Sequence, residues 1–171
     1  MATRWHGRRP AARSALAAVV IALAACASDP SRVPPGATRD QVLQQLGTPT
    51  AIYRLPQGER LQYSRGPSGF AVFNVDLDDA GRVRSVRQEL QEGLFDSTIR
   101  PGQWRVEDVL RTYGPPYQQT RVYSFNGTVW SWRYLNINSP RFLYIYVDPS
   151  GLVDHFNVGD DLDFDDHRRR W

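Results

Sequence analysis

The chain of 171 residues has about the length of one ordinary domain, and its 41% hydrophobic and 12% aromatic residues suffice for a core, which excludes a largely disordered protein. Four of its 21 basic residues precede Cys26, so the rest of the chain carries 17 basic and 18 acidic side chains. The formal net charge of +3 therefore comes from the N-terminal arginines, and the nearly neutral remainder gives no electrostatic basis for binding nucleic acid.

Residues 1–25 have the pattern of a bacterial export signal. An arginine-rich start is followed by an apolar run over residues 15–25, with small residues before the expected cleavage site. This run is about half of the roughly 20 residues that a membrane-spanning helix requires, so a signal peptide is favoured over a transmembrane anchor.

The only cysteine, Cys26, closes the sequence Leu23-Ala24-Ala25-Cys26, which resembles a bacterial lipobox. Without a second cysteine no intrachain disulfide can form, so the sulfur has no competing structural use. We expect Cys26 to carry diacylglycerol and to hold the protein on a membrane; a soluble secreted protein with an incidental cysteine is the alternative. Ala27 replaces the Asp that resembles an inner-membrane retention signal, which favours the outer membrane, and residues 26–34 then form a tether.

Two segments, 35–92 and 99–159, repeat one pattern. When the chain is laid on itself with a shift of 67 residues, the matching pairs are Val42 and Val109, Leu43 and Leu110, Gly47 and Gly114, and Pro49 and Pro116. Further matches follow at shifts of 69 and 70 residues, which places the extra residues in loops, as expected of a duplication.

Each unit begins with a short predicted helix. In the first unit Thr38 and Gln41 come close to a capping box, and Gly47 ends the helix ahead of Pro49. The second helix ends in the same way at Gly114, ahead of Pro116. Apolar residues recur at helical spacing in both helices, and Val106 and Tyr113 belong to the second of these stripes. Five of the apolar residues should be buried against a sheet, namely Val42, Leu43, Leu46, Val109 and Leu110.

Strands follow each helix. The first unit predicts them at residues 51–55, 59–65, 70–77 and 82–90, and the second at 119–125, 128–135, 141–147 and 152–158. Turns that begin with Asp and end at Gly81 and Gly151 join the last two strands of each unit. We therefore predict an α+β fold of two tandem units, each with four antiparallel strands covered on one face by the short helix; two independent domains on a linker are the alternative.

No pattern of residues predicts catalysis. The three histidines, His6, His155 and His167, form no recognisable arrangement with a nucleophile, and the glycines form no phosphate-binding loop. Residues 159–167 could offer carboxylates to Ca²⁺ but lack the spacing of a calcium loop, so a solvated acidic tail over 160–171 is favoured. We expect a non-enzymatic protein with no cofactor, no metal and no small-molecule substrate.

A binding face is predicted on the second unit. Leu143, Ile145 and Val147 align with core positions of the first unit, so alternation sends Phe142, Tyr144 and Tyr146 to the opposite face. Arg133 of the neighbouring strand should join them. Exposed Tyr and Arg are typical of protein-binding hot spots; the alternatives are that β-propensity alone favours these aromatics, or that the tail covers them.

The run from Gly36 to Pro49, GATRDQVLQQLGTP, resembles the opening of the BamE (SmpA/OmlA) outer-membrane lipoproteins, in which a Gly-Met-Thr-x-x-Gln-Val helix leads into Leu-Gly-Thr-Pro and a small antiparallel sheet. The doubled unit also resembles the β-lactamase inhibitory protein. Two features depart from BamE: the segment ASDPSRVPP replaces a Gln-Gly-Asn-like stretch, and the chain has two units instead of one.

The resemblance implies a periplasm-facing outer-membrane lipoprotein that binds or braces envelope proteins, with the β-barrel assembly machine as one candidate partner. The alternative that the second resemblance implies is an inhibitor-like module that blocks a periplasmic enzyme through its sheet.

Overall fold

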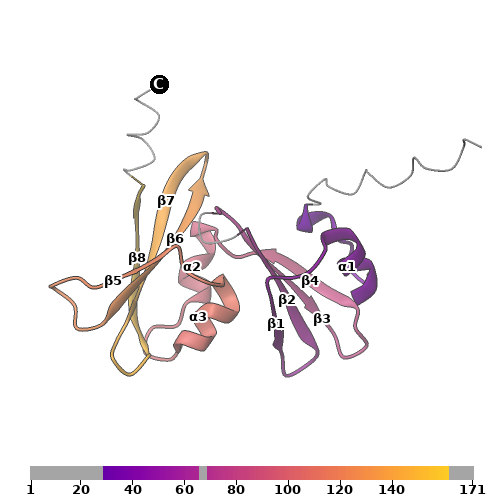
Figure 1. Ribbon diagram of the computed structural model, residues 1–171, viewed down its shortest axis with the longest axis horizontal. Coiled ribbons are helices and arrows are strands. Elements are labelled where there is room, and N and C mark those ends of the chain that lie inside the picture. Colours follow the sequence, from indigo (N-terminus) through magenta and orange to yellow (C-terminus); the bar gives the residue numbers. More distant parts are fainter. Residues whose placement is uncertain (1–28, 66–68, 162–171) are drawn as a thin grey trace, which may run out of the picture.

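The computed structural model describes residues 29–65 and 69–161, which form three α-helices, one 3-10 turn and two four-stranded antiparallel sheets (Figure 1). The first half contains η1 (Pro30–Arg32), α1 (Arg39–Leu46), β1 (Ala51–Arg54), β2 (Glu59–Ser64), β3 (Val72–Leu77) and β4 (Val83–Gln88). The second contains α2 (Glu92–Thr98), α3 (Val106–Tyr113), β5 (Gln118–Thr120), β6 (Thr128–Asn136), β7 (Ser139–Val147) and β8 (Val153–Asp160). The α+β class and the two sheet units agree with the prediction.

The helix ends follow the sequence signals. Thr38 Oγ1 accepts a hydrogen bond from the Gln41 N–H, and Gln41 Oε1 accepts one from the Thr38 N–H, which completes a capping box. Gly47 and Gly114 end α1 and α3 at φ of 79° and 67°, with ψ of −159° and −166°. That region of backbone space is essentially reserved for glycine, so both residues terminate their helices as predicted.

Each sheet is a meander in which strands that are neighbours in the sequence pair with one another. The turns before β4 and β8 contain Gly81 and Gly151 at φ of 70° and 81°, the left-handed conformation that the predicted turns require. A register shift accompanies each turn, at the end of β3 and at the end of β7.

Each unit has its own buried cluster. In the first, Val42 of α1 packs with Leu61 and Tyr63 of β2 and with Val75 and Leu77 of β3. In the second, residues of α3 pack with β6 and β7, the main members being Val109, Tyr113, Trp130, Trp132, Leu143 and Ile145. Leu43, Leu46 and Leu110, which we expected to be buried, are half-buried at the margins of these clusters.

Two elements differ from the prediction. The sequence pattern does not predict α2, which is only seven residues long and has no side-chain N-cap; Phe95 on it belongs to the second cluster. Strand β5 is shorter than the predicted segment 119–125, because the chain leaves the sheet after Thr120 and forms a largely exposed loop before β6. Packing of Phe95 against Tyr113 and Tyr134, which no local pattern encodes, accounts for the first difference.

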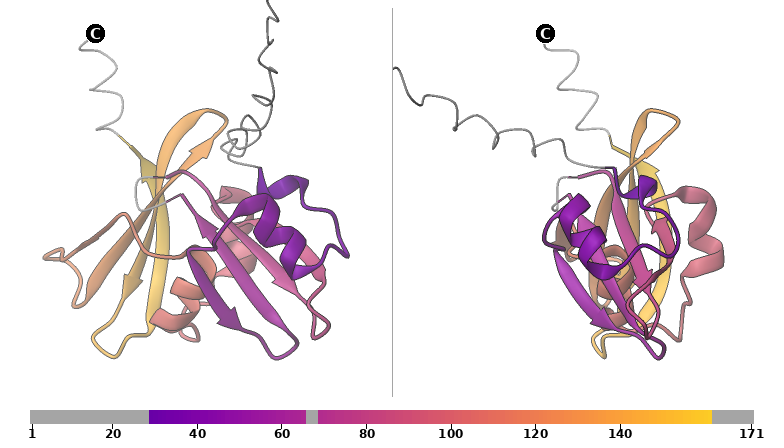
Figure 2. Two further views of the ribbon diagram at one scale, coloured as in Figure 1. Left: turned by 45° about the vertical axis from the view of Figure 1, so that its right-hand side comes forward. Right: turned by 90° about the vertical axis from the view of Figure 1, so that its right-hand side faces the viewer.

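The two units are stacked so that α3 lies between the two sheets and α1 lies on the far side of the first sheet (Figures 1 and 2). Val72 of β3 belongs to the second buried cluster, so the core of the second unit extends onto the first sheet. One face of the first sheet is therefore covered by α1 and the other by α3. None of the described helices lies on the outer side of the second sheet.

Candidate functional site

The four residues that were predicted to form a binding face, Arg133, Phe142, Tyr144 and Tyr146, lie on the side of the second sheet that points away from α3. Strands β6 and β7 pair with Arg133 opposite Phe142, and the β7 residues that alternate with these aromatics belong to the buried cluster. We call this surface, together with the residues that contact it from β8 and the flanking loops, the outer face.

Arg133 occupies the centre of the outer face. Its guanidinium carbon lies 4.4 Å from the ring centroid of Tyr117 and 5.4 Å from that of Phe142, within the range of cation–π contact. Its Nε lies 2.8 Å from Oδ2 of Asp161, whose side chain is completely buried. Two rings and one carboxylate thus fix the guanidinium in place.

The aromatic rings of the outer face contact one another across the strands. The ring centroid of Phe142 is 5.7 Å from that of Tyr117 and 5.6 Å from that of Tyr144. Toward the other end of β7, the ring of Tyr146 stacks on His155 of β8 at 3.9 Å, and Phe125 of the β5–β6 loop meets Tyr146 edge-on at 5.2 Å. Because the rings contact one another, each limits the positions that its neighbours can take.

Exposure divides the outer face into a supporting layer and an accessible layer. Phe142 differs from the prediction of an exposed aromatic: it is only 9% exposed, because Tyr117, Tyr144 and Arg133 surround it. Tyr144 and Tyr146 are half-buried, so part of each ring remains accessible. The accessible surface therefore comes mainly from these two tyrosines, and Phe142 and Arg133 lie beneath and beside them.

Sequence reasoning missed several members of the outer face. His155 could have been found from alternation along β8, since it lies opposite Tyr146. Tyr117 and Phe125 lie outside regular strands, so no period points to them. Asp161 was assigned to the charged tail, and only the fold brings its carboxylate to Arg133.

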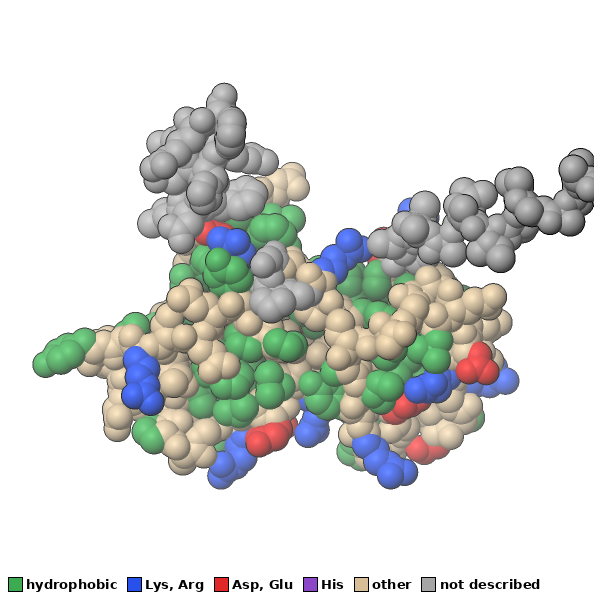
Figure 3. Space-filling view, in the orientation of Figure 1, with side chains coloured by type: hydrophobic (Ala, Val, Ile, Leu, Met, Phe, Trp, Pro, Cys, Tyr) green, Lys and Arg blue, Asp and Glu red, His purple; other side chains and the backbone are tan. Residues whose placement is uncertain are grey.

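The β5–β6 loop borders the outer face and exposes apolar side chains. Val122 is exposed and Tyr123 is fully exposed at its tip, where Figure 3 shows hydrophobic side chains at the end of the protruding loop. On the side of the molecule that Figure 3 shows, basic and acidic side chains lie scattered, with no extended basic patch among the described residues. This distribution agrees with the nearly neutral charge of the chain after Cys26.

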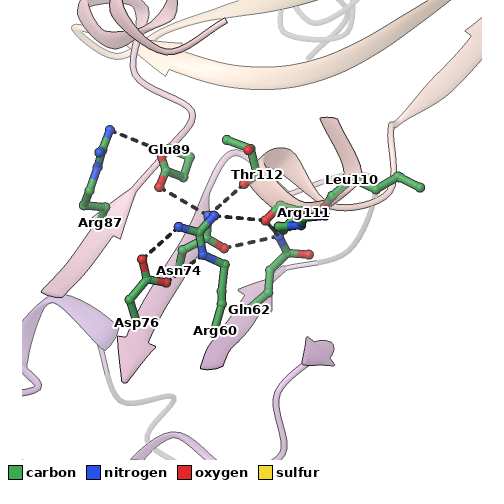
Figure 4. A network of polar contacts seen from close by, with 9 residues as sticks. All are labelled: Arg60, Gln62, Asn74, Asp76, Arg87, Glu89, Leu110, Arg111 and Thr112. Carbon is green, nitrogen blue, oxygen red and sulfur yellow. Dashed lines mark hydrogen bonds and ion pairs between the residues drawn. The ribbon is translucent and has the colours of Figure 1, made fainter. Parts of the chain in front are cut away.

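The corresponding face of the first sheet is occupied by the C-terminal end of α3 (Figure 4). The last carbonyls of a helix have no partner within the helix and carry the negative end of its dipole. Here side chains of the first sheet supply the donors: Gln62 Nε2 lies 3.3 Å from the oxygen of Leu110 and 3.1 Å from that of Arg111, and Asn74 Nδ2 lies 3.0 Å from that of Thr112.

Charged side chains complete this polar network. Arg60 Nη1 donates to the carbonyl oxygen of Arg111 at 3.3 Å, and its Nε and Nη2 bind the carboxylate of Asp76 at 2.6 and 2.8 Å. Burial works against the charge of Arg60, but its hydrogen bonds and ion pair with Asp76 outweigh burial and raise the Arg60 pKa. Glu89, 3% exposed, accepts from Asn74 and pairs with Arg87. The network fixes the two units to each other and leaves this face closed.

A second polar cluster braces the hairpin formed by β6 and β7. Glu92, the first residue of α2, accepts hydrogen bonds from Tyr134 Oη at 2.6 Å and Asn136 Nδ2 at 2.9 Å, and its carboxylate lies 2.7 Å from Arg141 Nη1. The hydrogen bond from Tyr134, with smaller contributions from Arg141 and Asn136, lowers the Glu92 pKa despite partial burial. Burial and the Glu92 carboxylate in turn raise the Tyr134 pKa.

No three His, Cys, Asp or Glu side chains among residues 29–65 and 69–161 come close enough to hold a metal ion. A hollow of about 630 Å³ beside α1 is lined by Pro34, Pro35, Gly36, Ala37 and glutamines of α1, none of which is titratable. In the same part of the chain, no helix is both long and apolar enough to cross a membrane.

Two sequence predictions concern residues outside the described ranges. Cys26 precedes Asp29, where the described chain starts, and all but three residues of the acidic segment 159–167 lie beyond Asp161. Lipidation of Cys26 therefore stays a prediction.

Comparison with known proteins gives no family assignment. No family model matches the chain, and no curated protein does. Among solved structures, the chain is similar to a DUF4309 family protein, YjgB, from Bacillus subtilis, with a TM-score of 0.31, 13% sequence identity, and coverage of 72% of this chain and 78% of that chain.

Proposed function

We propose that the protein is a non-catalytic, BamE-like outer-membrane lipoprotein that faces the periplasm and binds another envelope protein through the outer face of its second sheet. Cys26 carries the lipid, and the helices pack on the sheets as in the family that the sequence resembles. The observation that supports the binding role is the contrast between the two units: the chain itself covers the open face of the first sheet, whereas no described helix covers the outer face of the second.

The chemistry of the outer face suits a protein partner. Two half-buried tyrosines offer large apolar area with polar ends, and Arg133, Tyr117 and Phe142 hold them in place at little entropic cost on binding. The scattered charges, and the fact that no titratable side chain lines the hollow beside α1, favour a protein surface over a nucleic acid or a small substrate.

A crosslinking experiment in cells tests this function. A photoreactive phenylalanine analogue replaces Tyr144 in the full-length lipidated protein, and a matched control places it at Arg84, an exposed position of β4 in the first unit. We expect a specific adduct with one envelope protein from position 144 and none from position 84. A subunit of the β-barrel assembly machine as that protein supports the assembly role, and a periplasmic hydrolase supports an inhibitor.

A double substitution makes the test quantitative. Tyr144→Ala with Tyr146→Ala should weaken capture of the crosslinked partner by at least about tenfold, since one tyrosine hot spot is worth about 2 kcal/mol. Tyr123→Ala, which removes a fully exposed tyrosine from the loop, is the matched control and should leave capture unchanged. Equal capture by all three proteins, or equal adducts from positions 144 and 84, contradicts the proposal.

A further inference from the structure

The tip of the β6–β7 hairpin exposes two aliphatic side chains. Strands β6 and β7 pair along their whole length, down to Asn136 opposite Ser139, so that Ile137 and Asn138 form a two-residue turn. Ile137 is 92% exposed and Leu135, two residues earlier, is 47% exposed. Figure 1 shows this hairpin rising above the rest of the described chain.

The turn at Ile137 and Asn138 requires a backbone conformation that isoleucine disfavours. Ile137 and Asn138 have φ of 46° and 67°, as a turn with both central residues left-handed requires. Asn tolerates this conformation, but a β-branched residue in it is an outlier. Strain of this kind is typical of sites where the side chain serves a function, and the side chain here is a fully exposed isoleucine.

Polar contacts brace both strands of the hairpin close to its tip. Glu92 of α2 binds Tyr134, Asn136 and Arg141, which lie on both strands just before the turn. Arg141 also lies 3.2 Å from Asp160 of β8. These contacts hold the two strands in place just before the turn and favour the extended position of the apolar tip.

The tip and the expected lipid anchor lie at the same end of the molecule. Figures 1 and 2 both show η1, where the described chain starts, at the end from which the hairpin rises. The three residues from Cys26 to Asp29 span at most about 11 Å. An anchor on Cys26 therefore holds this end of the protein against the membrane and directs the hairpin toward it.

We propose that the β6–β7 hairpin tip inserts Leu135 and Ile137 into the surface of the membrane that carries the lipid anchor. This inference rests on the proposed lipidation of Cys26. Burial of two aliphatic side chains contributes too little free energy to recruit a free protein to a membrane. In an anchored protein the tip is already within a few ångströms of the bilayer, so the same contribution is enough to set the orientation of the protein on the membrane. The outer face of the second sheet then points sideways, parallel to the membrane, toward neighbouring membrane proteins.

A depth measurement tests the insertion. The full-length lipidated protein is reconstituted into vesicles of phosphatidylethanolamine and phosphatidylglycerol at 3:1, with Ile137→Cys labelled by an environment-sensitive nitrobenzoxadiazole dye. Because the lipid occupies the sulfur of Cys26, the introduced thiol is the one that reacts. The matched control is Ala80→Cys, an exposed position in the β3–β4 turn at the opposite end of the molecule. We expect quenchers on the acyl chains to reduce the emission from position 137 at least threefold more than that from position 80.

Two further measurements separate this inference from the anchor. Flotation of the protein with the vesicles, lost in Cys26→Ser, reports the anchor alone. Leu135→Asn should reduce quenching at position 137 at least twofold without affecting flotation, whereas Val122→Asn, which removes an exposed apolar residue from the β5–β6 loop, should change neither. Equal quenching at positions 137 and 80 in protein that floats overturns the insertion and leaves the anchor intact. Failure of the wild-type protein to float overturns both.

Discussion

Replacing Asn74 by leucine should destabilise the protein through the contact between its two units. Asn74 is 1% exposed, and its Nδ2 donates to the carbonyl oxygen of Thr112 at 3.0 Å and to Glu89 Oε1 at 3.2 Å. Its Oδ1 accepts from Gln62 Nε2 at 3.2 Å. Leucine has the same number of side-chain heavy atoms, branched at the same position, although its methyl groups are bulkier than the amide, so the substitution removes the hydrogen bonds without opening a cavity.

The expected loss follows from the groups that remain. The carbonyl oxygen of Thr112 loses its donor from the first sheet, and the Glu89 carboxylate, 3% exposed, keeps Arg87 Nη2 at 3.4 Å. Each buried polar group left without a partner costs about 1–3 kcal/mol, and a charged one costs more. We therefore expect the free energy of unfolding to fall by about 2–5 kcal/mol, which corresponds to a decrease of roughly 5–15 °C in Tm for a chain of this length.

Urea denaturation followed by tryptophan fluorescence measures this loss. Asn157→Leu is the matched control, because Asn157 also lies on a strand but is exposed, and its amide donates to the Tyr146 hydroxyl at 3.3 Å. This substitution should change the free energy of unfolding by less than about 0.5 kcal/mol. The wild type should unfold in one transition, because the polar network and Val72 join the two units. A loss below about 1 kcal/mol in Asn74→Leu, or two separate wild-type transitions, would refute this account.

Three further predictions concern the hairpin and the anchor. Because the Glu92 pKa is lowered in the folded state, the ionised carboxylate stabilises the fold above its ordinary pKa of 4.5, and this stabilisation is lost as the pH falls through the lower folded-state value. Glu92→Gln should therefore make the free energy of unfolding depend less steeply on pH in the acidic range. An unchanged acidic dependence contradicts this assignment. Ile137→Asn should raise the free energy of unfolding by about 1 kcal/mol because asparagine tolerates positive φ, and a loss of stability in urea titration argues against strain at this turn. Labelled palmitate should enter the wild type and disappear in Cys26→Ser, and label that persists in the variant rules out Cys26 as the lipid site.

The sequence predicts the local structure of this protein well, because short-range signals determine it. Thr38 and Gln41 form the capping box that their spacing indicates, and Gly47 and Gly114 end helices at positive φ because no other residue tolerates that backbone. Alternation along β7 places Leu143 in the core for the same local reason.

Contacts between distant segments are what the sequence does not reveal. Gln62 and Asn74 are polar residues on strands, and alternation alone would assign them to a solvent-exposed face. Both are buried, at 0% and 1% exposure, because their side chains hydrogen-bond to carbonyl oxygens at the end of α3. The pairing of Arg133 with Asp161 likewise depends on where β8 ends. Such contacts follow from the stacking of the units, which has no periodic signature.

The two units use equivalent surfaces in different ways, and their residues differ accordingly. With the 70-residue shift, Asn74 and Asp76 of β3 correspond to Tyr144 and Tyr146 of β7. In the first unit the end of α3 covers this face, and the Asn74 amide donates to the carbonyl oxygen of Thr112. The Asp76 carboxylate binds Arg60, which in turn donates to the carbonyl oxygen of Arg111. In the second unit no described helix approaches, and rings replace the amide and the carboxylate. This difference supports the proposal that the aromatic pair binds a partner outside this chain, one with an apolar contact surface and few unpaired carbonyls.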